Sequence, residues 1–270
     1  MQFEGNLRKM STELGDTVQY GLRLYDKLEA TAPIPLNKAV GHFILIEFLH
    51  EINCVVTGKK IKKSFGEGMS YDAFMNSPQA SPSIIRPELS RIHEGVALRD
   101  FEWEMKNHMT PHTVYLAQTA GVKVGVTRNT QIPTRWMDQG AVQAIRLAET
   151  PYRQAAGLIE VALKEFISDK TSWQKMLKGE FEPQDMLQLK ADMAAHVPLK
   201  FKQYITSNND LVKIKYPVIA HPPKVTSLKL DKVHVLDKKL MGIKGQYLLF
   251  DDGTVMNVRS HSGYRVRISF

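Results

Sequence analysis

Residues 112–140 carry a tyrosine, a lysine and an arginine in an arrangement that could act on a phosphodiester. Tyr115 and Lys123 belong to two short segments in which side chains alternate in character, and Arg135 follows shortly after them. The planar guanidinium of arginine matches the oxygens of a phosphate, and a phenol beside it can accept or orient a proton. These residue types predict phosphoryl chemistry, provided that folding gathers them at one place.

The two alternating segments predict a β-hairpin. In residues 114–117, Tyr115 shares one face of the strand with Ala117. The second segment places Val122, Val124 and Val126 on one face and Lys123, Gly125 and Thr127 on the other. The connecting residues QTAG include a glycine, as a short hairpin loop often does. We expect the valine face to be buried, so that Tyr115 and Lys123 share the opposite face, where Gly125 leaves room for a ligand or a helix.

Two helices are predicted after the hairpin. Pro133 fits the first turn of a short helix that carries Arg135 and ends at Gly140. A longer helix is expected over residues 152–168. Its apolar positions recur at helical spacing, at Ala155, Ile159, Ala162, Leu163, Phe166 and Ile167. Glu160 directly follows Ile159 at the edge of this stripe, so its carboxylate could face a partly enclosed cleft.

This arrangement resembles the core of the GIY-YIG nucleases. Residues 113–115 (TVY) occupy the place of the first motif and residues 123–125 (KVG) the place of the second. The resemblance implies that Tyr115 accepts or orients a proton, that Arg135 clamps a phosphate and that Glu160 binds Mg²⁺ or Mn²⁺. Lys123 departs from the pattern, because the second motif has a tyrosine there. A lysine can contact phosphate as a point charge, and Tyr115 also has a simpler interpretation as an aromatic residue packed against a helix.

Nearly the whole chain is similar to the bacterial domain-of-unknown-function family 2797. The resemblance is carried by six strings: INCVVTGKKIKKSF (52–65), RPEL (86–89), VKVGVTRNTQIPTRWMDQGA (122–141), DKTSWQKMLKGE (169–180), YPVIAHPPKVTSLKLDK (216–232) and GIKGQYLLFDDG (242–253). These strings are long and idiosyncratic, so they indicate membership of the family. They imply little about function.

The same resemblance implies a lost metal site. Members of the family carry cysteines of a zinc-knuckle type, of which this chain keeps Cys54. The other family cysteines align with Thr57, Ser70, Ala73, Ala80, Ser83 and Ser90. Because a tetrahedral zinc site needs four nitrogen or sulfur ligands, we predict no structural zinc and an inert, buried thiol at Cys54.

Residues 66–110 are rich in glycine, serine and proline and show little periodicity. Without a metal we expect them to be the least ordered internal segment. Their aromatic residues, with the neighbouring Phe65, are Phe65, Tyr71, Phe74, Phe101 and Trp103. We interpret these as filler of a small core, with a base-stacking platform as the alternative.

Composition and charge fit a globular protein with an acidic partner. The chain has 270 residues, of which 43% are hydrophobic and 24% charged, and its net charge is +8 with a pI near 9.4. Such a balance favours DNA or RNA as a partner, contacted by Lys59, Lys60, Lys62, Lys63 and Arg128. Solvated lysine-rich strand faces are the alternative. A single cysteine, the lack of a signal-peptide pattern and the lack of a long apolar run predict a cytoplasmic protein outside the membrane.

Several other residues have two interpretations. His108 and His112 are interpreted as loop or capping residues, with an acid–base role near Tyr115 as the alternative. Trp136 and Trp173 are predicted to anchor the core. Helix-end bonding or surface pairing accounts for Asp138, Asp169 and Lys170, and metal or phosphate contact is the other interpretation.

The predicted fold class is α+β. We expect an N-terminal β segment (1–65), a knuckle-like loop region (66–110), a GIY-YIG-like α/β unit (111–180), a helical connector (181–208) and a C-terminal β segment (209–270). The two β segments are expected to pack together as a sandwich or barrel around the inserted α/β unit. The function expected first is that of a metal-dependent phosphodiesterase acting on DNA or RNA. The alternatives are a non-catalytic nucleic-acid or ribonucleoprotein binding module and a protein-interaction adaptor.

Overall fold

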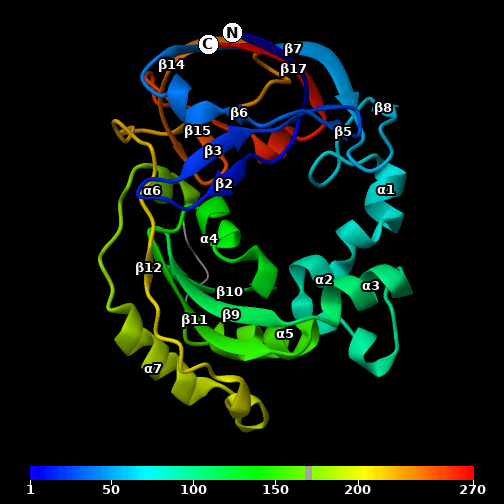
Figure 1. The fold of residues 1–270 in the computed structure, drawn as a ribbon, viewed down its shortest axis with the longest axis vertical. Coiled ribbons are helices and arrows are strands. Elements are labelled where there is room, and N and C mark those ends of the chain that lie inside the picture. The colour runs from blue at the N-terminus through cyan, green and yellow to red at the C-terminus, as the bar shows by residue number, and fades with distance from the viewer. Residues whose placement is uncertain (168–171) are drawn as a thin grey trace. The chain divides into compact units, whose positions relative to one another are not determined.

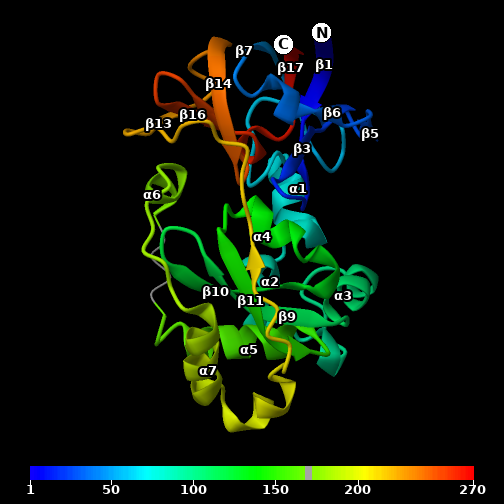
Figure 2. The same cartoon turned by 60° about the vertical axis from the view of Figure 1, so that its left-hand side comes forward.

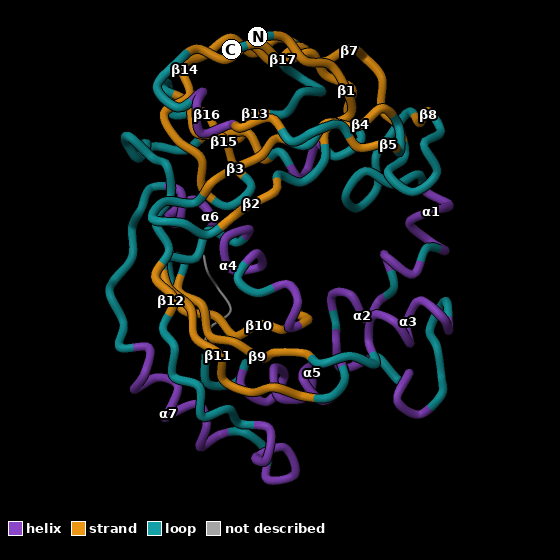
Figure 3. The backbone as a smooth tube through the Cα atoms, viewed as in Figure 1, coloured by secondary structure: helices purple, strands orange, loops and turns teal. Residues whose placement is uncertain are grey.

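The computed structural model describes residues 1–167 and 172–270, and in this part the chain forms two compact units. Unit 1 consists of Met1–Met75, Leu177–Gly179 and Lys215–Phe270, and unit 2 of Asn76–Met176 and Glu180–Ile214. Figure 1 and Figure 3 show that β-strands predominate in unit 1, whereas unit 2 mixes strands with helices. The predicted α+β class is confirmed.

Unit 1 is built on a ten-stranded sheet, counted over the described residues. Its order is β13-β16-β15-β14-β7-β17-β1-β4-β5, and β8 pairs with β7 (Figure 1). The bounds are β1 Gln2–Leu7, β4 Leu24–Asp26, β5 Glu29–Ala30, β7 Phe43–Asn53, β8 Lys60–Ile61, β13 Thr226–Leu228, β14 Val235–Lys244, β15 Tyr247–Phe250, β16 Thr254–Asn257 and β17 Tyr264–Ser269. A smaller sheet joins β2 Ser11–Glu13, β3 Gln19–Leu22 and β6 Ile34–Pro35.

The first and last segments of the chain pair directly, as predicted. Strand β1 runs antiparallel to β17 with Gln2 opposite Ser269, and β17 continues onto β7. Strand β7 alternates buried and less buried positions, with Ile44 and Ile46 in the core, which is the period that a half-buried strand requires. In the described residues the large sheet has free ends at β13 and β5, so the strands do not close into a barrel.

Unit 2 contains the predicted hairpin at the edge of a second sheet, ordered β10-β9-β11-β12. Its strands are β9 His112–Gln118, β10 Val122–Arg128, β11 Gln143–Thr150 and β12 Val212–Lys213. The helices α5 Arg153–Leu163 and α7 Met186–His196 cover one face (Figure 2). The valine face packs there, with Val114, Val124 and Ile159 in one core. Helix α4 Thr134–Asp138 lies on the opposite side of the sheet from α5 (Figures 1 and 2).

The helices after the hairpin begin where the sequence predicted, but α5 ends at Leu163, short of the predicted residue 168, and Phe166 is 50% exposed rather than part of its apolar stripe. Pro133 is the N-cap of α4, and Gly140 follows the end of that helix with a φ of +73°. Helix α7 lies within the predicted helical connector and ends before Pro198, and α6 covers Trp173–Leu177. Asp169 and Lys170 lie outside the described residues. No helix in the described part of the chain is long and apolar enough to span a membrane.

Residues 66–110 are more regular than predicted. All of them are described, and they contain helices α1 Tyr71–Asn76, α2 Pro82–Ile85 and α3 Phe101–His108. Local hydrogen bonds order α3, because Asp100 caps its N-terminus through Trp103 N and the buried Glu104 accepts from the backbone. The expectation of a poorly ordered loop was therefore wrong, since side-chain caps supply part of the order that a metal would otherwise provide.

Candidate functional site

The Tyr115 side chain lies under helix α4 and over Gly125. Its hydroxyl donates a hydrogen bond to Gln139 Oε1 at 3.2 Å, and its ring meets Trp136 edge-on at 6.0 Å between centroids. A Cβ atom at Gly125, directly opposite on β10, would lie 2.6 Å from the Tyr115 hydroxyl. The space over Gly125, which we expected a ligand or helix to use, is therefore filled by the phenol itself.

The Tyr115 phenol is completely buried but keeps polar neighbours. Burial raises the pKa of Tyr115, while the positive charge of Arg135 and a hydrogen bond from Arg135 act in the opposite direction. Glu160 is also near enough to raise that pKa. Tyr115 and Arg135 are therefore in hydrogen-bond contact, whereas Glu160, on the helix α5 that covers the other face of the sheet, acts on Tyr115 through its charge.

Glu160 lies on α5 with its side chain 11% exposed. Its Oε1 atom is 3.4 Å from Lys164 Nζ, one turn further along the helix. It also interacts electrostatically with the Arg153 guanidinium. The carboxylate therefore sits among cations, at the edge of the apolar stripe where the sequence placed it.

Arg153 is a residue of this centre that sequence reasoning missed. Its Nε donates to Ser83 O at 2.8 Å, one Nη donates to Ile84 O at 2.9 Å, and the other faces His112 Nε2 at 3.4 Å. Burial lowers the pKa of Arg153 to about 10, and the charges of Arg128 and Arg135 add to this effect. A signal was present in the sequence, because an arginine in the first turn opposes the helix dipole and needs a specific reason to be there.

Both histidines before the hairpin are buried and neutral at pH 7. His112 Nδ1 donates to Thr110 O at 2.6 Å, which leaves Nε2 as the acceptor facing Arg153. Burial lowers the pKa of His112 to about 4 and that of His108 to about 3, with the charges of Arg153 and Arg128 contributing. His108 Nδ1 contacts Ser90 Oγ at 3.2 Å. These contacts fit the positional roles that we preferred over acid–base catalysis.

Lys123 and Arg128 point to opposite faces of the hairpin. Lys123 pairs with Ala117 and so shares the face of Tyr115, whereas Arg128 pairs with His112 on the face covered by α5. An Nη atom of Arg128 donates to Asn107 Oδ1 at 2.5 Å, and both side chains of this pair are partly buried. The side chain of Arg128 is thus held by a neutral amide, and its positive charge acts on Arg153.

The segment RPEL packs closely on α5. A Cβ atom at Gly157 would lie 2.3 Å from Glu88 N, so only glycine permits this approach. Glu88 interacts electrostatically with Arg153 and pairs with Arg86 at 3.0 Å. The glycine in the middle of a predicted helix was the sequence signal for this contact, since glycine destabilises a helix interior and usually has a packing reason.

Positive charge exceeds negative charge around this centre. The charges of Arg128 and Arg135 both act on the Arg153 guanidinium, and the carboxylates of Glu88 and Glu160 are shared with Arg86 and Lys164. The buried indole N–H of Trp136 has no acceptor among the described residues. Trp136 is a core residue as predicted, whereas Trp173 is 38% exposed and was wrongly assigned to the core. Surplus cations together with a spare donor suit an anionic ligand.

A separate open cavity of about 730 Å³ lies elsewhere in unit 2. It borders the hairpin loop at Gly121 and is lined by exposed aromatic side chains, including Phe166 and Phe181. Neither Tyr115, Arg135 nor Glu160 lines it.

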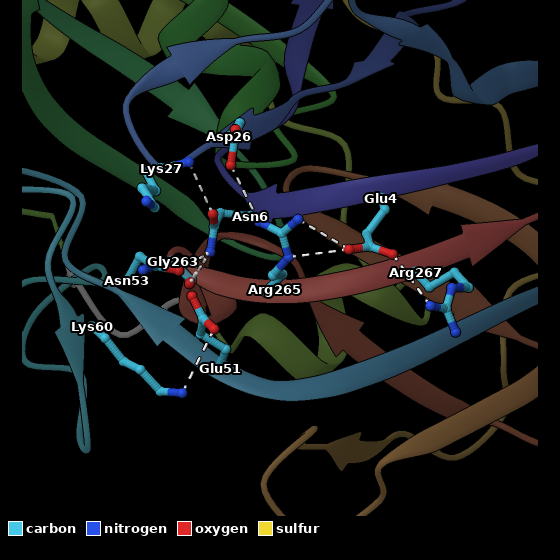
Figure 4. A network of polar contacts seen from close by, with 10 residues as sticks. All are labelled: Glu4, Asn6, Asp26, Lys27, Glu51, Asn53, Lys60, Gly263, Arg265 and Arg267. Atoms are coloured by element: carbon cyan, nitrogen blue, oxygen red, sulfur yellow. Dashed lines mark hydrogen bonds and ion pairs between the residues drawn. The ribbon is translucent and has the colours of Figure 1, made fainter.

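In unit 1, the arginines near the C-terminus are neutralised by ion pairs. Figure 4 shows Arg265 bound to Glu4 and Asp26, at 3.0 and 3.3 Å, and Arg267 bound to Glu4. Arg267 also reaches Glu47 at 2.9 Å. These arginines are therefore strand-face residues whose charges are balanced by carboxylates.

The lysine group predicted to contact nucleic acid is exposed throughout. Lys59, Lys60, Lys62 and Lys63 all belong to the turn and short strand that follow β7. Lys60 lies 3.6 Å from Glu51 (Figure 4). The ammonium of Lys63 is 5.4 Å from the centroid of the Phe65 ring. Lys59, Lys62 and Lys63 form no ion pair with the residues that the structure describes.

Cys54 is completely buried, as predicted. Burial opposes ionisation of the thiol, but hydrogen bonds from Thr57 and from the Ser70 backbone N–H outweigh it and lower the pKa of Cys54 to about 7. Thr57 and Ser70, two of the positions aligned with family cysteines, therefore still surround this sulfur. Within the described residues, no group of three or more histidine, cysteine, aspartate or glutamate side chains is arranged to hold a metal.

The fold and this centre define an α+β protein in which arginine and tyrosine side chains meet beside a hairpin. The chain belongs to the family described as Protein of unknown function (DUF2797), whose profile matches residues 41–266. No protein with a curated description and no solved structure matches the chain.

Proposed function

We propose that the protein acts on nucleic acid, and that the unit 2 centre engages one phosphodiester group. The observation that carries this proposal is the hydrogen bond between Arg135 and Tyr115, with the charge of Glu160 acting on the same phenol. Arg135 supplies the fork that suits phosphate oxygens, and the surplus of positive charge favours an anion. The similarity of residues 112–170 to the GIY-YIG nuclease core assigns the same three residues to phosphodiester hydrolysis.

In the catalytic form of the proposal, a divalent ion would be held by Glu160. Mg²⁺ is commonly bound through one or two carboxylates plus water and substrate phosphates, so a single glutamate is a sufficient protein ligand. The ion would supply Lewis-acid stabilisation of the reacting phosphoryl oxygens. Arg135 would bind a non-bridging oxygen, and Tyr115, held by Gln139, would orient the group being attacked.

Cleavage of labelled single- and double-stranded DNA and RNA, with and without Mg²⁺ or Mn²⁺, tests this form directly. We expect metal-dependent cleavage that falls by roughly 10²–10³-fold in Arg135→Ala and Glu160→Gln proteins, in the range found when one transition-state contact is removed. Matched controls are Arg91→Ala, which removes an exposed pair with Glu94, and Glu165→Gln at an exposed position just after α5. Thermal unfolding shows whether each protein is folded. Absence of metal-dependent cleavage by the native protein overturns the catalytic form.

The second candidate is binding without cleavage, and two observations favour it. Tyr115 is fully buried with a raised pKa, and Lys123 stands where the nuclease pattern has its second tyrosine. This form predicts salt-sensitive binding that weakens in Arg135→Ala but is unchanged or tighter in Glu160→Gln, because only the latter removes a negative charge. Equal binding by all these proteins would exclude this centre from contact with nucleic acid.

A further inference from the structure

Unit 1 contains a second place where positive charge and aromatic rings meet. It consists of Lys59, Lys62, Lys63, Phe65, Tyr71 and Phe74, and we name it the lysine–aromatic surface. These residues lie in the turn after β7, in strand β8 and its continuation, and in helix α1. All of them belong to unit 1, so their arrangement depends on that unit alone.

Phe65 is the centre around which the other groups are arranged. Its ring centroid lies 5.3 Å from that of Tyr71 and 6.5 Å from that of Phe74. Lys63 places its ammonium 5.4 Å from the same ring. Gly66, with a φ of +55°, allows the backbone to approach the Phe74 ring closely. The cluster is therefore held by the turn, by ring contacts and by a cation.

The outer rings of the cluster are open to solvent, contrary to our prediction that they fill a small core. Tyr71 is 58% exposed and Phe74 is 37% exposed. The neighbouring Met75 is 48% exposed. A grouped set of exposed apolar side chains is uncommon on a soluble protein and marks a surface that contacts something. The rings offer faces on which another flat group can stack.

The charge around these rings is positive. Lys59, Lys62 and Lys63 are exposed and form no ion pair within residues 1–167 and 172–270. The nearby Glu67 is occupied by Arg259, at 2.7 Å. Asp72 stands in the first turn of α1, where its charge favours the helix N-terminus. The lysines remain available to a polyanion, unlike the paired arginines of the same unit.

We propose that the lysine–aromatic surface binds single-stranded nucleic acid, with bases stacked on Tyr71 and Phe74 and phosphates contacted by Lys62 and Lys63. Exposed bases stack on aromatic side chains regardless of sequence, while lysines follow the backbone. In a duplex the bases are stacked on one another, so this surface favours single strands. The choice of nucleic acid as ligand rests on the proposed function, but the surface is separate from the residues that carry that function.

Fluorescence anisotropy of a labelled oligothymidylate, titrated with the full chain at low salt, tests the stacking. Loss of a stacked base contact costs a factor of roughly 5 to 100 in affinity, so we expect a weakening of that order in Tyr71→Ala and Phe74→Ala proteins. Phe43→Ala is the matched control, because Phe43 is 63% exposed at the opposite end of β7. The duplex of the same length should bind more weakly than the single strand and respond little to the ring substitutions.

The salt dependence of binding tests the lysines separately. Each phosphate contact to a single strand contributes about 0.7 to the slope of log K against log salt, so Lys62→Gln and Lys63→Gln should each reduce the slope by about that amount. Lys38→Gln, at another exposed lysine of unit 1, should leave the slope unchanged. Equal slopes in all of these proteins would contradict phosphate contact at this surface.

Conservative substitutions separate stacking from folding. Tyr71→Phe and Phe74→Tyr keep a ring at each position and should restore affinity, whereas mere damage to α1 would appear as a lowered unfolding temperature.

Photocrosslinking with 5-iodouracil oligonucleotides should mark Tyr71 or Phe74. Native affinity in a folded Tyr71→Ala, Phe74→Ala double variant, or no binding of oligothymidylate by the native chain, overturns the proposal. Metal-dependent cleavage that survives in that double variant would leave the proposed function standing.

Discussion

Two arginines near the C-terminus in unit 1 and the arginines around His112 in unit 2 are held in opposite ways. In unit 1, Arg265 and Arg267 lie on a strand face and are bound by the carboxylates of Glu4, Asp26 and Glu47. In unit 2, Arg128 and Arg153 are anchored by neutral oxygen atoms, whereas Arg86, Arg91 and Arg146 pair with carboxylates. Arg153 is held by two backbone carbonyls and Arg128 by an amide.

The difference separates structural charge from charge that can serve a ligand. A cation that already has a carboxylate gains little from a phosphate and costs free energy to strip of its partner. Cations that are held by carbonyls and amides keep most of their electrostatic attraction for an anion. Burial strengthens that attraction, because the protein interior screens charges less than water does. A net charge of +8 is therefore a poor guide by itself, because some arginines are neutralised by carboxylates and others are held by neutral oxygen atoms.

Replacing Arg153 should produce the largest loss of stability. Arg153→Met leaves the carbonyls of Ser83 and Ile84 without their donors in a buried place, and we expect a loss of roughly 3–5 kcal/mol in the free energy of unfolding. Urea unfolding followed by circular dichroism measures it. A loss below about 1 kcal/mol would mean that Arg153 contributes no more to the free energy of unfolding than the surface arginines of unit 1 do.

Acid should destabilise unit 2 through His112. Its pKa is lowered from 6.5 to about 4 in the folded protein, so the unfolded chain binds more protons between these values. The contribution is complete above pH 6.5 and is lost as the pH falls towards 4, which amounts to roughly 3 kcal/mol. Unfolding free energies measured across this window should fall less steeply in His112→Gln. An identical pH dependence in the two proteins would show that His112 is not buried as a neutral imidazole.

Filling the space at Gly125 should have a smaller but local effect. Gly125→Ala places a methyl group 2.6 Å from the Tyr115 hydroxyl, so the ring must move, at a cost of about 1–3 kcal/mol. In the catalytic form of the proposed function, cleavage should fall more than stability does. Gly15→Ala, where the nearest heavy atom lies 3.5 Å from the added methyl, is the control for an unobstructed glycine. Unchanged activity in a folded Gly125→Ala protein would remove Tyr115 from the site.

The smallest effect is expected for the ion pairs of unit 1. Arg265→Gln breaks contacts with Glu4 and Asp26 at a partly exposed position, and such pairs contribute roughly 0.2–1 kcal/mol. The loss should shrink further in molar salt, because mobile ions screen exposed charges. If Arg265→Gln cost as much as Arg153→Met, the contrast between the two units would fail.

Much of the local structure could be predicted from the sequence. The alternation around Tyr115 and Gly125 predicted the hairpin, Pro133 predicted the start of the short helix that follows it, and residues 1–65 were correctly predicted to be rich in strands. These features depend on periodicity and on backbone constraints that act within a few residues. Residues 66–110 were misjudged, because short helices held by caps such as Asp100 leave little periodic signal.

The sequence by itself determined which residue types were available for chemistry and on which face of each element they lay. Only the tertiary structure decided that Arg153 joins Glu160, that the phenol of Tyr115 fills the space over Gly125, and that Tyr71 and Phe74 lie outside rather than in a core. The physical reason is that burial and charge compensation depend on contacts between residues far apart in the chain. Local patterns carry no record of which distant carboxylate or carbonyl an arginine will meet.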